Sequence, residues 1–202
     1  MFRYLAPALR LMILFTVLCG IVYPLIATGL CQWWFPRQAN GSLIHAQGRA
    51  VGSALLGQQF TGAGYFHGRP SAAGQGYDGL ASGGSNLGPS NPALAARLLT
   101  AAARFRRDNP AFHGQIPSDL ITASGSGLDP DISPAAAAAQ SPRVAAARGL
   151  PLAQVLDLVR RKTEPRTWHL LGEPRVNVLA LNLALDQLTQ EQGAGSDRGR
   201  RP

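Results

Sequence analysis

The hydrophobic pattern is dominated by one apolar run, from Leu11 to Trp34, that contains no charged residue. A stretch of about 20 apolar residues matches the hydrocarbon thickness of a bilayer. Arg10 precedes the run and Trp33 and Trp34 close it, and both basic flanks and indoles are typical of membrane interfaces. We therefore predict a transmembrane anchor over 11–34, with Arg10, Trp33 and Trp34 at its interfaces, after a short cytoplasmic tail over 1–10.

The alternative to an anchor is a cleaved signal peptide, because Ala27 and Gly29 are small residues of the kind found at cleavage sites. The run is longer than the usual signal-peptide core, which favours a retained helix. A short tail ahead of a long domain indicates a cytoplasmic amino terminus and a domain exported to the periplasm or cell exterior. The charge asymmetry that would fix this orientation is weak. Pro24 predicts a kink in the helix.

After the anchor, the pattern predicts a mixed α+β exported soluble domain over 35–189. We expect a strand at 49–56, paired with 42–46, after a connector that follows the membrane. The segment 57–92 is rich in glycine, serine and asparagine, which excludes a long regular element. Its aromatic residues favour an ordered loop over a linker.

Helix-start signals then recur along the chain. Asn91 before Pro92 predicts a helix that ends near Asp108, and Ser133 before Pro134 predicts a second one. We expect that second helix to break or restart at Pro142 and to stop at Gly149. Between the two, 116–123 reads as a strand that leads into a glycine-rich turn.

The remaining pattern predicts an amphipathic helix over 150–162 and a short strand over 167–171. Asn177 is predicted to cap a last helix that runs through Leu188. The tail over 190–202 has no large apolar side chain able to dock it, and we expect it to be disordered.

Composition restricts the chemistry. Both cysteines, Cys19 and Cys31, lie in the apolar run, about 18 Å apart along a helix, so they cannot form a disulfide and the exported domain has no thiol. The net charge of +8 comes almost entirely from scattered arginines without an aromatic stacking platform. We therefore predict no nucleic-acid binding, and a basic module that binds anionic envelope polymers remains an alternative.

Candidate catalytic residues are few. Ser124 and Ser126 lie near Asp129 in the glycine-rich turn, but the spacing lacks the nucleophile elbow of hydrolases. A serine hydrolase that uses one of them with His113 or His169 stays open as an alternative. The histidines have no metal-ligand spacing, and the glycine-rich loop has no lysine to hold a nucleotide phosphate. We predict no catalytic, metal or cofactor site in the chain alone.

Three long segments carry a resemblance. They read YFHGRPSAAGQGYDGLASGGSNLGPSNPAL, SDLITASGSGLDPDISPAAAAAQSPRVAAARGLP and LGEPRVNVLALNLALD. With the anchor, they closely resemble the C subunit of the bacterial potassium-transporting ATPase, the Kdp system, over nearly the whole chain except the tail. Two positions look atypical for the family that the chain resembles: His67, where the family favours tryptophan, and Asp131, where it favours histidine.

The resemblance implies a non-catalytic accessory subunit of a pump in the bacterial inner membrane. Its implied partners are a potassium-conducting, channel-like subunit, a P-type ATPase subunit and the lipid bilayer, and ATP and potassium act at the level of the complex. It also implies a catalytic chaperone that raises the affinity of the ATPase subunit for ATP. Ten residues match the family's motif positions, and we expect them to act as partner contacts or scaffold: Arg69, Asn86, Asn91, Ser124, Ser126, Asp129, Gln140, Arg143, Asn177 and Asn182.

Overall fold

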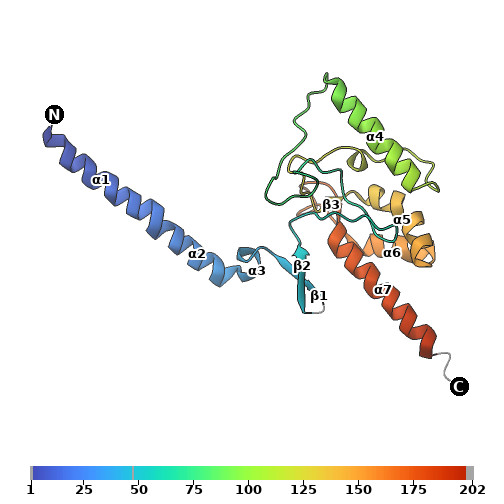
Figure 1. Cartoon of the computed structure of the whole chain (residues 1–202). Coiled ribbons are helices and arrows are strands. Elements are labelled where there is room, and N and C mark those ends of the chain that lie inside the picture. The colour runs from blue at the N-terminus through green and yellow to red at the C-terminus, as the bar shows by residue number, and fades with distance from the viewer. Residues whose placement is uncertain (1, 47, 199–202) are drawn as a thin grey trace. The chain divides into compact units, whose positions relative to one another are not determined.

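The computed structural model describes residues 2–46 and 48–198 and divides the chain into two compact units, 1–53 and 54–202 (Figure 1). The first unit carries the apolar helix and a hairpin. The second carries α4 to α7, a small sheet and the glycine-rich loop. A single helix is thus followed by a mixed α+β domain, as the pattern predicted.

The first unit begins with a 3-10 turn, Phe2–Tyr4, followed by α1 (Leu5–Val17), a π-helical stretch η2 (Leu18–Val22) and α2 (Tyr23–Trp34). Together these make one candidate membrane span of 30 residues, Leu5–Trp34, with no buried residue. The helix starts six residues before the predicted 11–34 boundary, because residues 5–9 are apolar and the long side chain of Arg10 can reach an interface from within a helix.

Pro24 lies in the first turn of α2, directly after the π-helical stretch. Proline has no N–H to donate to the carbonyl four residues earlier, and a π-helical turn is a common local adjustment to such a defect. The deformation that the sequence predicted at Pro24 is therefore a change of helical winding over Leu18–Val22.

A short helix α3 (Pro36–Ala39) follows, and then a hairpin of β1 (Leu43–Ala46) and β2 (Arg49–Ser53). The strands are antiparallel, and their register shifts between Ile44 and His45. The predicted pairing of 42–46 with the strand that starts at Arg49 is confirmed.

In the second unit, the core is built by α5 (Pro134–Arg148), α6 (Leu152–Lys162) and α7 (Val178–Arg198). They pack with a three-stranded antiparallel sheet whose order is β3 (Asp131–Ile132), β5 (Arg175–Asn177) and β4 (Thr163–Glu164). The buried side chains include Val144, Val155, Val176, Leu181 and Leu185. The helix α4 (Pro92–Asp108) buries Phe105 alone among its own residues.

Local helix signals are confirmed. Asn91 and Ser133 accept hydrogen bonds from the N–H groups of Ala93 and Ala136 at the starts of α4 and α5. Asn177 accepts one from Ala180 N at the start of α7. Gly149 ends α5 in the left-handed region, at φ 64°. These caps follow from each residue's immediate neighbours, which is why sequence alone finds them.

Two predicted strands are wrong. The segment 116–123 forms a 3-10 turn, Ser118–Leu120, because the Asp119 carboxylate accepts hydrogen bonds from the N–H and the hydroxyl of Ser133. The segment 167–171 closes on itself through one antiparallel bridge between Thr167 and Leu171, so it is a tight turn.

Two helix limits also differ. The helix α5 continues through Pro142, because its residues on both sides of the proline are buried in the core and packing offsets the lost hydrogen bond. The helix α7 runs to Arg198, ten residues beyond the predicted end at Leu188. Beyond the predicted end, the side chain of Gln192 donates to that of Gln154 at 2.6 Å. The rest of the predicted disordered tail, 199–202, lies outside the described residues.

Candidate functional site

The glycine-rich loop is attached to the core by two buried amide side chains. Asn182 on α7 accepts a hydrogen bond from Phe66 N at 2.8 Å and donates one to Phe66 O at 3.0 Å. Gln140 on α5 does the same for His67, at 2.8 and 3.0 Å. The backbone N–H and C=O groups of two consecutive residues thus have side chains as partners in place of a neighbouring strand. Because Asn182 and Gln140 are each 1% exposed, these bonds are shielded from water.

Arginines on α5 bind the same loop. Arg143 donates to the carbonyl of Tyr65 at 3.0 Å, to that of Ala63, and to the side-chain oxygens of Gln140 and Asn109, both at 2.9 Å. The guanidinium of Arg143 therefore ties together the loop, the end of α4 and one of the two buried amides. Arg143 is therefore a point of contact between three parts of the second unit.

Arg148, five residues further along α5, also binds the loop. It donates to Gly64 O at 2.8 Å, forms an ion pair with Asp186 at 2.7 Å, and lies over the Tyr65 ring at 4.4 Å. Its side chain is only 15% exposed, so the charge requires these partners.

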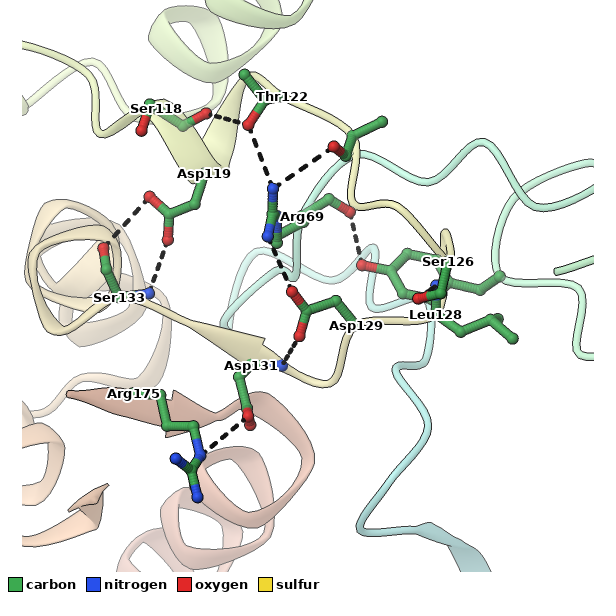
Figure 2. A network of polar contacts seen from close by, with 12 residues as sticks. Arg69, Ser118, Asp119, Thr122, Ser126, Leu128, Asp129, Asp131, Ser133 and Arg175 are labelled. Carbon is green, nitrogen blue, oxygen red and sulfur yellow. Dashed lines mark hydrogen bonds and ion pairs between the residues drawn. The ribbon is translucent and has the colours of Figure 1, made fainter. Parts of the chain in front are cut away.

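The turn over 124–130 forms the second part of the site (Figure 2). Asp129 forms an ion pair with Arg69 at 2.9 Å, and its other oxygen accepts from Asp131 N at 3.0 Å. The opposite nitrogen of Arg69 points to Thr122 and to the carbonyl of Ala123, at 3.4 and 3.5 Å. Arg69 and Asp129, predicted together as motif residues, thus connect the glycine-rich loop to this turn.

Asn177 joins the turn to the sheet. Its side-chain nitrogen donates to Ala54 O at 3.0 Å and to Asp131 at 3.3 Å, while its oxygen caps α7. Asp131 also pairs with Arg175 at 3.3 Å (Figure 2). Asp131 therefore has a defined set of partners at a position that looked atypical in the sequence.

Close backbone approach holds the turn against the loop. Gly127 has φ 68°, and a Cβ there would lie 2.6 Å from Ala73 N and 2.7 Å from Gly83 O. Both contacts are with backbone atoms, which cannot swing away as a side chain can. Ser71 Oγ donates to Gly127 O at 2.6 Å, and Gly83 N donates to Ser126 O at 2.8 Å. Only glycine fits position 127.

Burial changes the acidity of three groups in this region. Burial, with the nearby Asp129 carboxylate, raises the pKa of Tyr77 to about 12, and its hydroxyl donates to Arg69 O at 2.6 Å. Burial and then Asp129 also raise the pKa of Asp131. Burial and then Arg143 lower the pKa of His67, whose ring contacts Gly62 O at 3.1 Å. Each shift favours the uncharged form of the group.

The predicted motif residues divide into three groups. Six belong to the two polar clusters: Arg69, Asp129, Gln140, Arg143, Asn177 and Asn182. Ser124 is buried beside them, and the Ser126 hydroxyl accepts from Leu128 N at 3.1 Å. Asn86 and Asn91 are exposed, the first at φ 51° in the loop and the second as the cap of α4.

Sequence reasoning missed Asn109, Asp119, Arg148 and Asp186 as members of these clusters. Their partners lie 14 to 121 residues away along the chain. A local pattern carries no signal for such pairs.

Neither serine is arranged as a nucleophile in the part of the chain that the structure describes. No hydrogen bond joins Ser124 or Ser126 to a histidine, and His113 and His169 are exposed. An activated serine needs a base within hydrogen-bond reach. Over residues 2–46 and 48–198, no three histidine, cysteine or carboxylate side chains gather as a metal site would require. The contacts described above fix the glycine-rich loop and the turn over 124–130 to the core.

Comparisons with known proteins agree with one another. The family model described as the K+-transporting ATPase c chain, KdpC, matches residues 5–187. A protein of Gemmatimonas aurantiaca named potassium-transporting ATPase KdpC subunit is 58% identical over 190 residues, which are 94% of this chain and 95% of that protein. Proteins of the same name from Acidobacterium capsulatum and Salmonella enteritidis are 57% and 55% identical. They cover 92% and 91% of this chain and 99% and 95% of their own lengths.

Proposed function

Because this chain belongs to the KdpC family, the c chains of K+-transporting ATPases, we propose that it is a non-catalytic accessory subunit of an ATP-driven potassium import complex. The observation that carries the proposal is the extent of the match. The family model covers residues 5–187, which include both the candidate span and most of the compact second unit.

The proposed location is the bacterial inner membrane, crossed once by the helix Leu5–Trp34. The amino terminus lies in the cytoplasm and the second unit on the periplasmic or outer side. This orientation is supported by the short segment before the helix and the long domain after it. Arg10 lies inside the helix, and Trp33 and Trp34 lie at its end, where indoles favour the headgroup layer.

In the complex, the span and the exported unit clamp the potassium-conducting, channel-like subunit and so hold it together with the P-type ATPase subunit. The support for a clamp is the rigidity of the exported surface. Its loop and turn have few regular elements, yet buried amides and arginines fix them on α5 and α7. A pre-ordered surface loses less entropy when it binds a partner.

A role as a catalytic chaperone, which raises the affinity of the ATPase subunit for ATP, is part of the proposal. With the proposed orientation, the exported unit and cytoplasmic ATP are on opposite sides of the membrane. The effect on ATP must then be a coupling free energy carried through the neighbouring subunits. ATP and potassium are accordingly ligands of the complex.

The test is purification of the potassium pump from cells with and without this chain, followed by measurement of potassium-stimulated ATP hydrolysis. We expect the other subunits to separate, or to lose potassium stimulation and show a higher KM for ATP, when the chain is missing. Adding back the full-length chain restores both. Normal assembly and turnover without the chain would refute the proposal.

A second measurement tests the orientation independently. Protease applied to right-side-out vesicles should cut the chain after residue 35, and protease applied to inverted vesicles should leave that part intact. Protection in the first case and cleavage in the second would place the domain in the cytoplasm and remove the clamp.

A further inference from the structure

The segment that joins β4 to β5 presents large apolar side chains to solvent. Every residue from 164 to 174 is exposed. Trp168 and Leu170 are 84% and 76% exposed, and Leu171 is exposed by more than half. These three side chains, gathered within four residues of one turn, are called the apolar tip below. Apolar side chains gathered at one exposed place are typical of a surface that contacts a membrane or another protein.

Hydrogen bonds within the turn hold the apolar tip in place. Thr167 N donates to Leu171 O at 2.8 Å, and Leu171 N and Leu170 N donate to Thr167 O at 2.9 and 3.1 Å. Trp168 and His169 both lie in the left-handed region, at φ 53° and 60°. This conformation is disfavoured for a bulky residue, and burial within the second unit does not offset it, because Trp168 is exposed. We expect a contact outside the unit to offset it.

Charged side chains close the base of the turn. Arg166 donates to both carboxylate oxygens of Glu173 at 2.7 Å, and Arg175 pairs with Glu164 at 2.8 Å. From residue 160 to residue 175 the chain has five cations and two carboxylates. The excess comes from the last turn of α6, where residues 160–162 are all basic. An apolar tip with a basic base matches the surface of an anionic membrane in both polarity and charge.

The size of the apolar tip favours a bilayer over a protein partner. A stable protein interface buries roughly 800 Å² on each partner, which is more than three side chains expose. A bilayer has no such requirement, because its interface accepts apolar side chains one at a time, and indoles favour that layer.

The bilayer is also near along the chain. The candidate span ends at Trp34, and the second unit begins at residue 54, twenty residues later. Part of this connection is folded as α3 and the β1–β2 hairpin, which shortens its reach. A short tether gives a high effective concentration, so that even a weak contact is populated.

We propose that the turn over 166–173 is a second membrane contact of the chain. Trp168, Leu170 and Leu171 enter the interfacial layer of the bilayer, and the excess of basic side chains attracts a leaflet that contains anionic lipids. Such a contact restricts the rotation of the second unit on its tether, which lowers the entropy lost when the unit binds a partner. The inference rests on the proposed anchorage of the helix Leu5–Trp34 in a membrane, and not on which pump subunits the chain binds.

The test uses tryptophan fluorescence. Trp33→Phe and Trp34→Phe leave Trp168 as the single tryptophan of the full-length chain. This chain is reconstituted into vesicles of phosphatidylcholine, with or without phosphatidylglycerol, whose brominated acyl chains quench indole emission at close range. Because both leaflets have the same composition, the orientation of the chain does not affect the reading. The variant is Leu170→Gln, and the matched control is Leu99→Gln, because Leu99 on α4 is 72% exposed, close to the 76% of Leu170.

We expect the brominated lipids to quench Trp168, more strongly with phosphatidylglycerol and less at high salt, which screens the charge attraction. Leu170→Gln should lower the docking equilibrium constant, measured from the quenched fraction, about tenfold, as for the burial of one leucine. Leu99→Gln should leave that constant unchanged. Urea midpoints should agree among the parent chain and both variants, because both leucines are exposed.

A chain that floats with the vesicles but shows no quenching of Trp168 would overturn the inference and leave the anchorage intact. A chain that does not float would refute the anchorage itself, and the inference with it. An equal loss of quenching in Leu99→Gln would overturn the assignment to this turn. Equal quenching with and without phosphatidylglycerol would overturn the role of the basic side chains. Protection of Trp168 only in the assembled pump would reveal a protein partner and would likewise overturn the inference.

Discussion

Replacing Asn182 by alanine should lower the free energy of unfolding of the second unit more than replacing any exposed residue does. The Asn182 side chain makes the hydrogen bonds of both the backbone N–H and the backbone C=O of Phe66, at 2.8 and 3.0 Å, and Phe66 is fully buried. With alanine, one N–H and one C=O are left buried and unpaired. Each costs about 1–3 kcal/mol, so the free energy of unfolding should fall by roughly 2–6 kcal/mol. That is a large part of the 5–15 kcal/mol typical of a whole protein.

The assay is urea unfolding of the full-length chain in detergent, followed by circular dichroism and by fluorescence, with Asn91→Ala as the control. Asn91 also uses its side chain to accept from a backbone N–H, but it is exposed at the start of α4, and its loss should cost about 1 kcal/mol. If Asn182→Ala shifts the unfolding midpoint no more than Asn91→Ala does, the buried amide is not what holds the loop.

A second variant tests the N–H donor of the Asn182 side chain separately from the size of that side chain. Asn182→Asp keeps an acceptor for Phe66 N but, when ionised, offers no donor to Phe66 O. Burial raises the pKa of such a carboxyl, so the stability of Asn182→Asp should rise relative to the parent chain as the pH falls through that raised pKa. A deficit that does not change with pH would contradict this reasoning.

Two further predictions rest on other contacts. Gly127→Ala should lower the free energy of unfolding by at least about 2 kcal/mol, because the backbone there is left-handed and the new Cβ would clash with Ala73 N and Gly83 O. Gly125→Ala should be near neutral, because a Cβ there has no atom within 4 Å. The measurement is the urea midpoint of each variant. His67 has a lowered pKa when folded, so the unfolded chain takes up its proton first, and stability should be lost as the pH falls below 6.5 toward the folded pKa. His67→Gln should flatten that part of the stability curve, and an unchanged slope would exclude His67 as its source.

How far the sequence predicted the structure depends on the range of each interaction. The caps at Asn91, Ser133 and Asn177 were predicted because each partner lies two or three residues away. The strand expected at 116–123 is absent because Asp119 binds Ser133, fourteen residues downstream. Pro142 was expected to interrupt α5, since the pattern does not show how much core packing surrounds it.

The candidate site shows the same division. The motif residues Arg69, Asp129, Gln140 and Asn182 were selected through a family resemblance, and the structure shows what they contact. Their pairing could not be read from the sequence, because the partners are separated by 60, 73 and 116 residues. Arg148 lies in one of the segments that carry the resemblance but was not among the selected residues, and only the fold brings it to Asp186.

The two buried amides also constrain the order of events during synthesis. The backbone groups of His67 and Phe66 emerge from the ribosome long before their partners: Gln140 follows His67 by 73 residues, and Asn182 follows Phe66 by 116. Contacts of such long range form late and slowly. The backbone groups of Phe66 must therefore wait, unpaired, until α7 has been translated, and a polypeptide truncated before Asn182 would leave this part of the glycine-rich loop open to proteolysis.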